Sequence, residues 1–147
     1  MQISESLEMA AAPRQVWAVL TDLPGYERWN PFIVSASGSA VVGEKITARL
    51  QPPGGSGMTF RPRLTIVETD RRFAWLGHLL VPGLFDGAHE FTLEPTADGG
   101  TRFTQCETFS GLLVPLFKGT IEKAREGFRQ MNQALAVAAE SHTDKKP

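Results

Sequence analysis

The last third of the chain carries the pattern that most constrains the fold. Apolar residues recur there at alternating steps of four and three: Phe117, Ile121, Ala124, Phe128, Met131, Leu135 and Ala138. Charged residues such as Lys118, Glu122 and Arg129 fill the opposite side. This spacing predicts one long amphipathic helix that begins near Pro115 and has a single apolar face to bury. The rest of the chain must supply a layer that covers this face.

The central part of the chain is typical of a strand meander. Extended runs alternate with Gly, Pro and Asp from Phe32 to about Gly111, and a run of alternating polarity stands near the N-terminus. The expected strands are Gln2–Met9, Phe32–Ser37, Lys45–Gln51, Met58–Glu68, Arg72–Val81, Phe85–Pro95 and Thr101–Ser110. Because the connections are too short for parallel crossovers, we expect antiparallel neighbours.

Two short helices are expected between the first strand and the second. Pro13 suits the first turn of a helix that ends near Asp22. Tyr26–Trp29 follows as one or two helical turns, which Pro31 stops because it disfavours the helical conformation of the residue before it.

These elements predict an α+β fold in which a seven-stranded, curved antiparallel sheet wraps around the C-terminal helix. We expect one domain over residues 1–140 and a polar tail over residues 141–147. A sheet that curves around one helix leaves a space between them, which is a natural place for a small ligand.

Composition and charge exclude several classes of partner. The 147 residues carry a formal net charge of -1, so no basic face is expected to attract nucleic acid. The apolar stretch Leu112 to Phe117 is far shorter than the roughly 20 residues that span a bilayer, so no membrane span is expected. The single Cys106 and the absence of a signal-like start favour the cytoplasm. A homodimer through an exposed strand is compatible with the sequence, although no pattern requires one.

Several segments together resemble one known superfamily. They are Val16 to Asp22, Trp29-Asn30-Pro31-Phe32, Phe73-Ala74-Trp75, His89 to Pro95, Gly100-Thr101 and Phe109 to Leu112. Their order and spacing are similar to those of SRPBCC proteins, which include START-related lipid-transfer domains, polyketide cyclases and dehydrases, and the plant pollen-allergen fold. The resemblance runs from Gln2 to about Glu140 and implies the helix-grip fold. It does not select a function, because such domains range from passive binders to enzymes.

Strand alternation places a few polar residues among the apolar ones that face the interior. His89 shares a strand face with Phe91 and Leu93, and Gln105 and Glu107 alternate with outward residues on the next strand. The expected polar contacts to a ligand are therefore His89, Gln105 and Glu107. The expected apolar wall comprises Phe60, Trp75, Phe91, Phe103, Phe109, Phe117, Ile121, Phe128 and Met131.

His89 and Glu107 are the candidate catalytic pair, since an inward carboxylate near a histidine can move protons. The structural alternatives remain open: His89 satisfies a neighbouring group at the rim of the sheet, and Glu107 forms a structural ion pair or is solvated at the strand end. Trp75 is equally compatible with packing and with orienting a ligand.

Other reactive residue types are given structural roles. Arg61 and Arg63 are expected on the outer surface, unless a bulge at Pro62 turns one of them inward. Cys106 lies out of phase with the inward aromatic residues and is expected to be unreactive. The histidines occur singly, so neither a metal site nor a cofactor is expected.

Three functions follow as hypotheses. The first is a binding protein for a small hydrophobic molecule such as a lipid, a polyketide or an isoprenoid-like compound, and it is favoured over an enzyme. The second is a cyclase or dehydratase that folds a polyketide-like chain in the same cavity and uses His89 with Glu107. The third is a non-catalytic interaction module whose cavity is filled by its own side chains.

Overall fold

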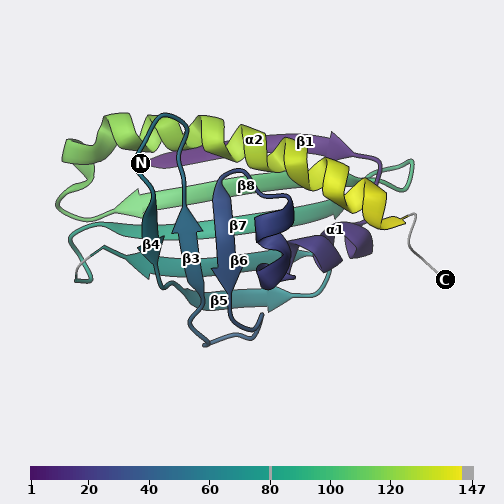
Figure 1. Ribbon diagram of the computed structural model, residues 1–147, viewed down its shortest axis with the longest axis horizontal. Helices are drawn as coiled ribbons and strands as arrows, with labels where there is room; N and C mark the ends of the chain where they lie inside the picture. Colours follow the sequence, from purple (N-terminus) through teal and green to yellow (C-terminus); the bar gives the residue numbers. More distant parts are fainter. Residues whose placement is uncertain (80, 144–147) are drawn as a thin grey trace.

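The computed structural model describes residues 1–79 and 81–143, and its larger sheet has five antiparallel strands. Their order across the sheet is β1, β8, β7, β6, β5 (Figure 1). The bounds are β1 (Gln2–Met9), β5 (Arg63–Glu68), β6 (Arg72–His78), β7 (Asp86–Pro95) and β8 (Thr101–Ser110). β7 and β8 form a hairpin in continuous register from Asp86 opposite Ser110 to Pro95 opposite Thr101.

A second antiparallel sheet of three strands crosses in front of the first one in Figure 1. It contains β2 (Ile33–Ser37), β3 (Thr47–Leu50) and β4 (Met58–Phe60). A short bridge between Lys45 and Arg63 and a hydrogen bond from the Ile46 amide to the Pro62 carbonyl (2.9 Å) join the two sheets.

The expected curved antiparallel architecture is confirmed, but the strand count differs from the prediction. The described residues form eight strands in two sheets, because the segment predicted as one strand, Met58–Glu68, divides into β4 and β5 at Arg61 and Pro62. Proline has no N–H for the strand ladder and fixes its φ angle, so the chain turns there from one sheet to the other. The strand expected over Arg72–Val81 also ends early, at His78, and Leu80 lies outside the described residues.

Two short helices follow β1, as predicted, and a long one closes the chain. They are α1 (Pro13–Leu20) and the 3-10 helix η1 (Leu23–Arg28), and the C-terminal element is the 3-10 turn η2 (Val114–Phe117) continued by α2 (Lys118–Thr143). α2 lies along β1 and also packs on α1 (Figure 1). The helix takes in the first residues of the tail expected at 141–147, and residues 144–147 lie outside the described residues.

The core lies between the five-stranded sheet, the three-stranded sheet and α2. Its fully buried members come from all three layers and include Ile33, Trp75, Phe91, Phe128 and Leu135. Gly127 permits a close approach here, since a Cβ at this position would lie 2.3 Å from Cδ1 of Phe32. The Phe32 ring instead packs edge-on against Phe128, with centroids 5.6 Å apart. No helix within the described residues combines the length and the hydropathy that a membrane crossing requires.

Candidate functional site

The register of β7 and β8 brings the two candidate catalytic residues together. His89 stands directly opposite Glu107, and both side chains lie on the face of the sheet that α2 covers. Nδ1 of His89 is 3.3 Å from Oε1 of Glu107. The histidine side chain is 4% exposed and the glutamate side chain 18%, so the carboxylate forms the more accessible end of the pair.

A chain of buried hydrogen bonds continues from the other nitrogen of the histidine ring. Nε2 of His89 lies 2.9 Å from Oε1 of Gln105, and Nε2 of Gln105 donates to Oδ1 of Asn132 (2.8 Å). Nδ2 of Asn132 donates in turn to the backbone carbonyl of Glu5 on β1 (3.2 Å). The polar interior therefore connects three strands with α2.

Asn132 is a site residue that the sequence analysis missed. It is 3% exposed and lies four residues after Phe128, so it shares the apolar face of α2. A polar side chain on that face was the available signal, because a buried amide needs hydrogen-bond partners.

Aromatic rings surround the histidine. The rings of Trp75, Phe91 and Phe128 have their centroids 5.1, 4.7 and 5.1 Å from that of His89. The remaining residues of the expected apolar wall fall into two groups. Phe103, Phe109, Ile121 and Met131 are buried with the core, whereas Phe60 and Phe117 are half-buried.

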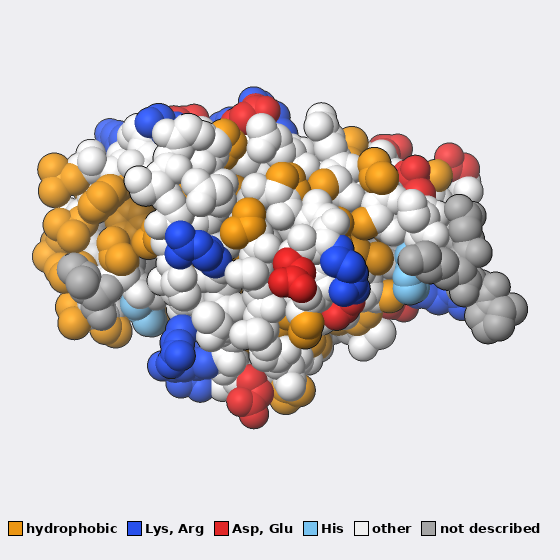
Figure 2. Space-filling model, viewed as in Figure 1, with side chains coloured by type: hydrophobic (Ala, Val, Ile, Leu, Met, Phe, Trp, Pro, Cys, Tyr) orange, Lys and Arg blue, Asp and Glu red, His pale blue; other side chains and the backbone are white. Residues whose placement is uncertain are grey.

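One end of this interior lies next to an exposed apolar surface. Phe85, which the sequence analysis also missed, packs on Phe109 and Phe117 with centroids 5.6 and 5.1 Å away. The loop between β6 and β7 is bonded to the segment before η2, since the Leu112 amide donates to the Gly83 carbonyl. Hydrophobic side chains gather at this end of the molecule (Figure 2). Val81, Leu112 and Leu116, which are 54%, 81% and 77% exposed, belong to this group; we call these three residues the apolar rim.

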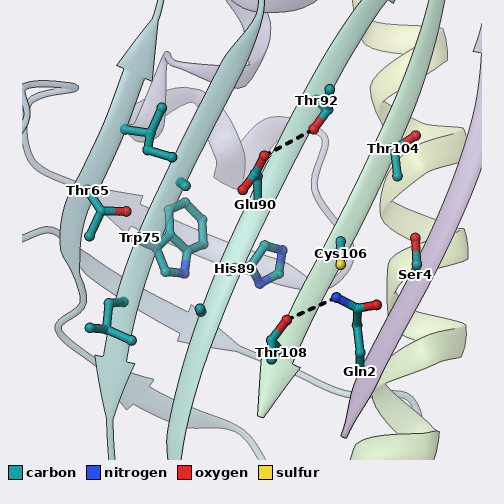
Figure 3. A pocket seen from close by; sticks show the side chains of 14 residues that line it. Gln2, Ser4, Thr65, Trp75, His89, Glu90, Thr92, Thr104, Cys106 and Thr108 are labelled. Carbon is teal, nitrogen blue, oxygen red and sulfur yellow. Dashed lines mark hydrogen bonds between the residues drawn. The ribbon is translucent and has the colours of Figure 1, made fainter. Parts of the chain in front are cut away.

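A hollow of about 500 Å³ is open on the face of the five-stranded sheet that points away from α2 (Figure 3). Small and polar residues of the outward positions line much of it, and Trp75 and His89 also belong to its lining (Figure 3). The small and polar ones include Ser4, Thr92, Thr104, Cys106 and Thr108. Between the sheet and α2, where the ligand cavity was expected, buried aromatic and aliphatic side chains occupy the space.

The outer face holds the residues that were expected to be unreactive or solvated. Partial burial, together with the nearby carboxylate of Glu90, raises the pKa of the Cys106 thiol, which keeps it protonated at neutral pH. Arg61 and Arg63 are both exposed. No group of three His, Cys, Asp or Glu side chains that could hold a metal ion occurs within residues 1–79 and 81–143.

A second histidine–carboxylate pair lies near the apolar rim. Nδ1 of His78 is 2.7 Å from Oδ1 of Asp86, and the Gly83 amide donates to both carboxylate oxygens. The hydrogen bond with His78, helped by the Gly83 amide, lowers the pKa of Asp86. This pair fastens the loop between β6 and β7.

A protein-family model matches most of the chain. A sequence model of the family described as "Polyketide cyclase / dehydrase and lipid transport" matches residues 1–140. No curated protein matches the sequence.

Solved structures share the fold at low sequence identity. An aromatase/cyclase, Zhui, from Streptomyces sp. R1128 is 14% identical with a TM-score of 0.79, and the match covers 97% of this chain and 95% of that one. A START superfamily protein from Mycobacterium smegmatis is 17% identical with a TM-score of 0.75, covering 95% and 97%. Protein MLL2253 from Mesorhizobium loti is 19% identical with a TM-score of 0.74, covering 96% and 98%. At these identities the likeness shows a common fold.

Proposed function

Because this chain belongs to the polyketide cyclase/dehydrase and lipid transport family of SRPBCC proteins, we propose that it binds a small hydrophobic molecule between the five-stranded sheet and α2. The ligand is of the lipid, polyketide or isoprenoid-like kind. The observation that carries the proposal is a polar pair, buried His89 and half-buried Glu107, beside an aromatic interior that includes Phe109 and Phe128. An interior built only for stability has no need of a histidine there.

The ligand reaches the site past Phe85, Phe109 and Phe117. Phe85 packs on both of the other rings, and Phe85 and Phe117 are only half-buried. Because side chains fill the interior, binding requires this end of the molecule to open, and the aromatic rings then become walls of the site. The apolar contact area provides the affinity, at roughly 25 cal/mol per Å² before the cost of immobilising the ligand.

The polar group of the ligand is a hydrogen-bond donor in this proposal. Glu107 uses Oε1 toward His89, while Oε2 lies over Gly87, where a Cβ would come within 2.4 Å of it. No described residue donates a hydrogen bond to Oε2. Because the Glu107 side chain is 18% exposed, a hydroxyl or phenol on an otherwise apolar molecule could donate to Oε2 in place of solvent.

Binding of a matched pair of aromatic probes tests this site. We expect 2-naphthol to quench the tryptophan fluorescence and to bind about tenfold more tightly than naphthalene, because a hydrogen bond to a charged group contributes about 1.5–3 kcal/mol. Glu107→Leu should abolish the difference, whereas the control Glu94→Gln, an exposed carboxylate on the neighbouring strand β7, should retain it. Equal affinities of both probes for the unaltered protein would show that the ligand hydroxyl does not donate a hydrogen bond to Glu107.

Native mass spectrometry of the protein purified from its own host identifies the natural ligand. A stoichiometric apolar compound released on denaturation supports the binding function. An apo mass, together with no binding of either naphthalene probe, would instead favour the interaction module, whose partner would cover the apolar rim.

A cyclase or dehydratase is the second candidate function, and the 3.3 Å approach of His89 to Glu107 favours it. In that case the pair exchanges a proton with the bound chain. With the extracted compound as substrate, His89→Ala and Glu107→Gln should stop turnover while leaving binding within a few-fold. Unchanged mass of the compound after incubation with the unaltered protein would leave the binding function alone.

A further inference from the structure

The hydrogen-bond chain that reaches His89 begins at a group that can only accept a hydrogen bond. The backbone carbonyl of Glu5 carries no hydrogen and can only accept. Nδ2 of Asn132 lies 3.2 Å from it, and Asn132 is almost fully buried, so water cannot replace this partner. The amide of Asn132 must therefore present its NH2 group to β1 and its oxygen to Gln105.

β1 also holds the helix at this position. The Glu5 carboxylate receives hydrogen bonds from Arg129 (2.9 Å) and Arg125 (3.2 Å), which precede Asn132 on α2. The backbone of Glu5 and its side chain thus both bind α2. This double attachment keeps the Asn132 amide in one orientation.

The orientation passes along the chain to the histidine. Oδ1 of Asn132 accepts from Nε2 of Gln105, which leaves Oε1 of Gln105 facing His89 at 2.9 Å. An amide oxygen accepts and never donates, so Nε2 of His89 must carry a hydrogen. A neutral ring with its hydrogen on Nε2 has a bare Nδ1, and this atom faces a carboxylate oxygen of Glu107.

We infer that Asn132 is a positioning residue that acts through Gln105 to keep a hydrogen on Nε2 of His89. In the neutral ring this leaves Nδ1, the nitrogen that faces Oε1 of Glu107, without a hydrogen. The groups packed on the ring, Trp75, Phe91 and Phe128, do not ionise, so Glu107 is the ionisable contact of His89 in the described chain.

Without Asn132 the hydrogen of the neutral ring could move to the other nitrogen. Gln105 could then turn its amide and donate to Nε2 of His89, and the ring would place its only hydrogen on Nδ1, facing Glu107. The amide chain therefore decides which ring nitrogen carries hydrogen, and under the proposed function this sets which nitrogen is bare on the side of Glu107, where the ligand binds.

The tautomer of His89 in the ligand-free protein tests the inference, independently of whether any ligand binds. In 15N-histidine-labelled protein, long-range 15N–1H correlation spectra distinguish a nitrogen that carries hydrogen from a bare one. We expect Nε2 of His89 to carry hydrogen throughout the pH range in which the protein is folded. His78→Gln and His142→Gln variants assign the signals, and a bare Nε2 in the unaltered protein would overturn the inference by itself.

Two substitutions of Asn132 separate positioning from structural support. Both Asn132→Asp and Asn132→Leu remove the amide donor to Glu5, but the aspartate keeps an oxygen that accepts from Gln105. We expect the Asp variant to retain hydrogen on Nε2 and the Leu variant to show a bare Nε2 with hydrogen on Nδ1. The control Gln133→Ala changes an exposed neighbour and should match the unaltered protein. A Leu variant that keeps the original tautomer would refute the role of Asn132.

Discussion

The two histidine–carboxylate pairs of this protein have the same local construction and different surroundings. In each, the histidine stands directly opposite the acid on a neighbouring antiparallel strand: His78 opposite Asp86, and His89 opposite Glu107. In each, Nδ1 faces a carboxylate oxygen, at 2.7 Å in the first pair and 3.3 Å in the second. The His78 side chain is 36% exposed, whereas the His89 side chain is 4% exposed.

The difference lies in what stands behind each pair. The His78–Asp86 pair lies at the surface, is bonded to a loop amide, and holds the loop between β6 and β7 in place. The His89–Glu107 pair is backed by aromatic rings and by an amide chain that ends on another strand. An imidazole and a carboxylate thus hold a surface loop in one place and join a buried hydrogen-bond chain in the other, because burial and hydrogen-bond partners set their roles.

The aromatic wall is the larger part of this difference. Phe128 is fully buried and contacts both Phe32 and His89. We expect Phe128→Ala to lower the free energy of unfolding by about 3–5 kcal/mol, as truncation of buried aromatic residues does. Urea denaturation measures the loss, with the exposed Val137→Ala on the same helix as a control near zero. A loss below about 1 kcal/mol would show that α2 does not close over His89.

Replacing each histidine by leucine compares the two pairs directly. His89→Leu leaves Oε1 of Gln105 buried without a donor, so we expect a loss of about 1–3 kcal/mol in the free energy of unfolding. His78→Leu exposes Asp86 to water, which satisfies it, and the free energy of unfolding should stay within experimental error. Equal losses in the two variants, measured by urea denaturation, would contradict the distinction between them.

Much of the fold could be predicted because it follows from local patterns. The alternation of Thr101–Ser110 and the apolar stripe of the last helix depend on the side chain at each position and on its neighbours in sequence. Strand bounds also carry register: a hairpin whose strands end at Pro95 and begin again at Thr101 places His89 opposite Glu107. The approach of these two residues could therefore be predicted from the sequence.

The remainder depends on packing between distant segments. Asn132 contacts Gln105 only because α2 packs on β1 at one particular position along the helix axis. The helical period predicts which face is buried, but it does not fix this position. Phe85 reaches Phe117 through a loop whose path has no periodic pattern. The division of Met58–Glu68 at Pro62 could be predicted, since proline disrupts a strand. The change from one sheet to the other there depends on the hydrogen bond between Pro62 and Ile46, which are distant in sequence.

Acid should release the exposed pair locally. The hydrogen bond with His78, with that of the Gly83 amide, holds the pKa of Asp86 below its ordinary value of 3.8. A lowered pKa in the folded state means that this contact stabilises the loop above pH 3.8 and that the stabilisation is lost as the pH falls through the lower, folded-state value. Amide exchange followed by mass spectrometry should accordingly show the Gly83 amide protected at pH 5 and released in stronger acid.

Asp86→Asn should have the smallest effect, a local loss of amide protection in the loop between β6 and β7. The variant lacks the ionised carboxylate, so the Gly83 amide should exchange faster already at pH 5, while the amides of β7 and β8 around His89 keep their protection. Asp98→Asn is the matched control, because this aspartate also has a lowered pKa, through Thr96, but in a turn at the opposite end of the β7–β8 hairpin. If Asp86→Asn also reduced protection around His89, the loop and the interior would open as one unit. The His78–Asp86 pair would then stabilise the same end of the molecule through which the ligand enters. Local unfolding around the two pairs would be coupled and not independent.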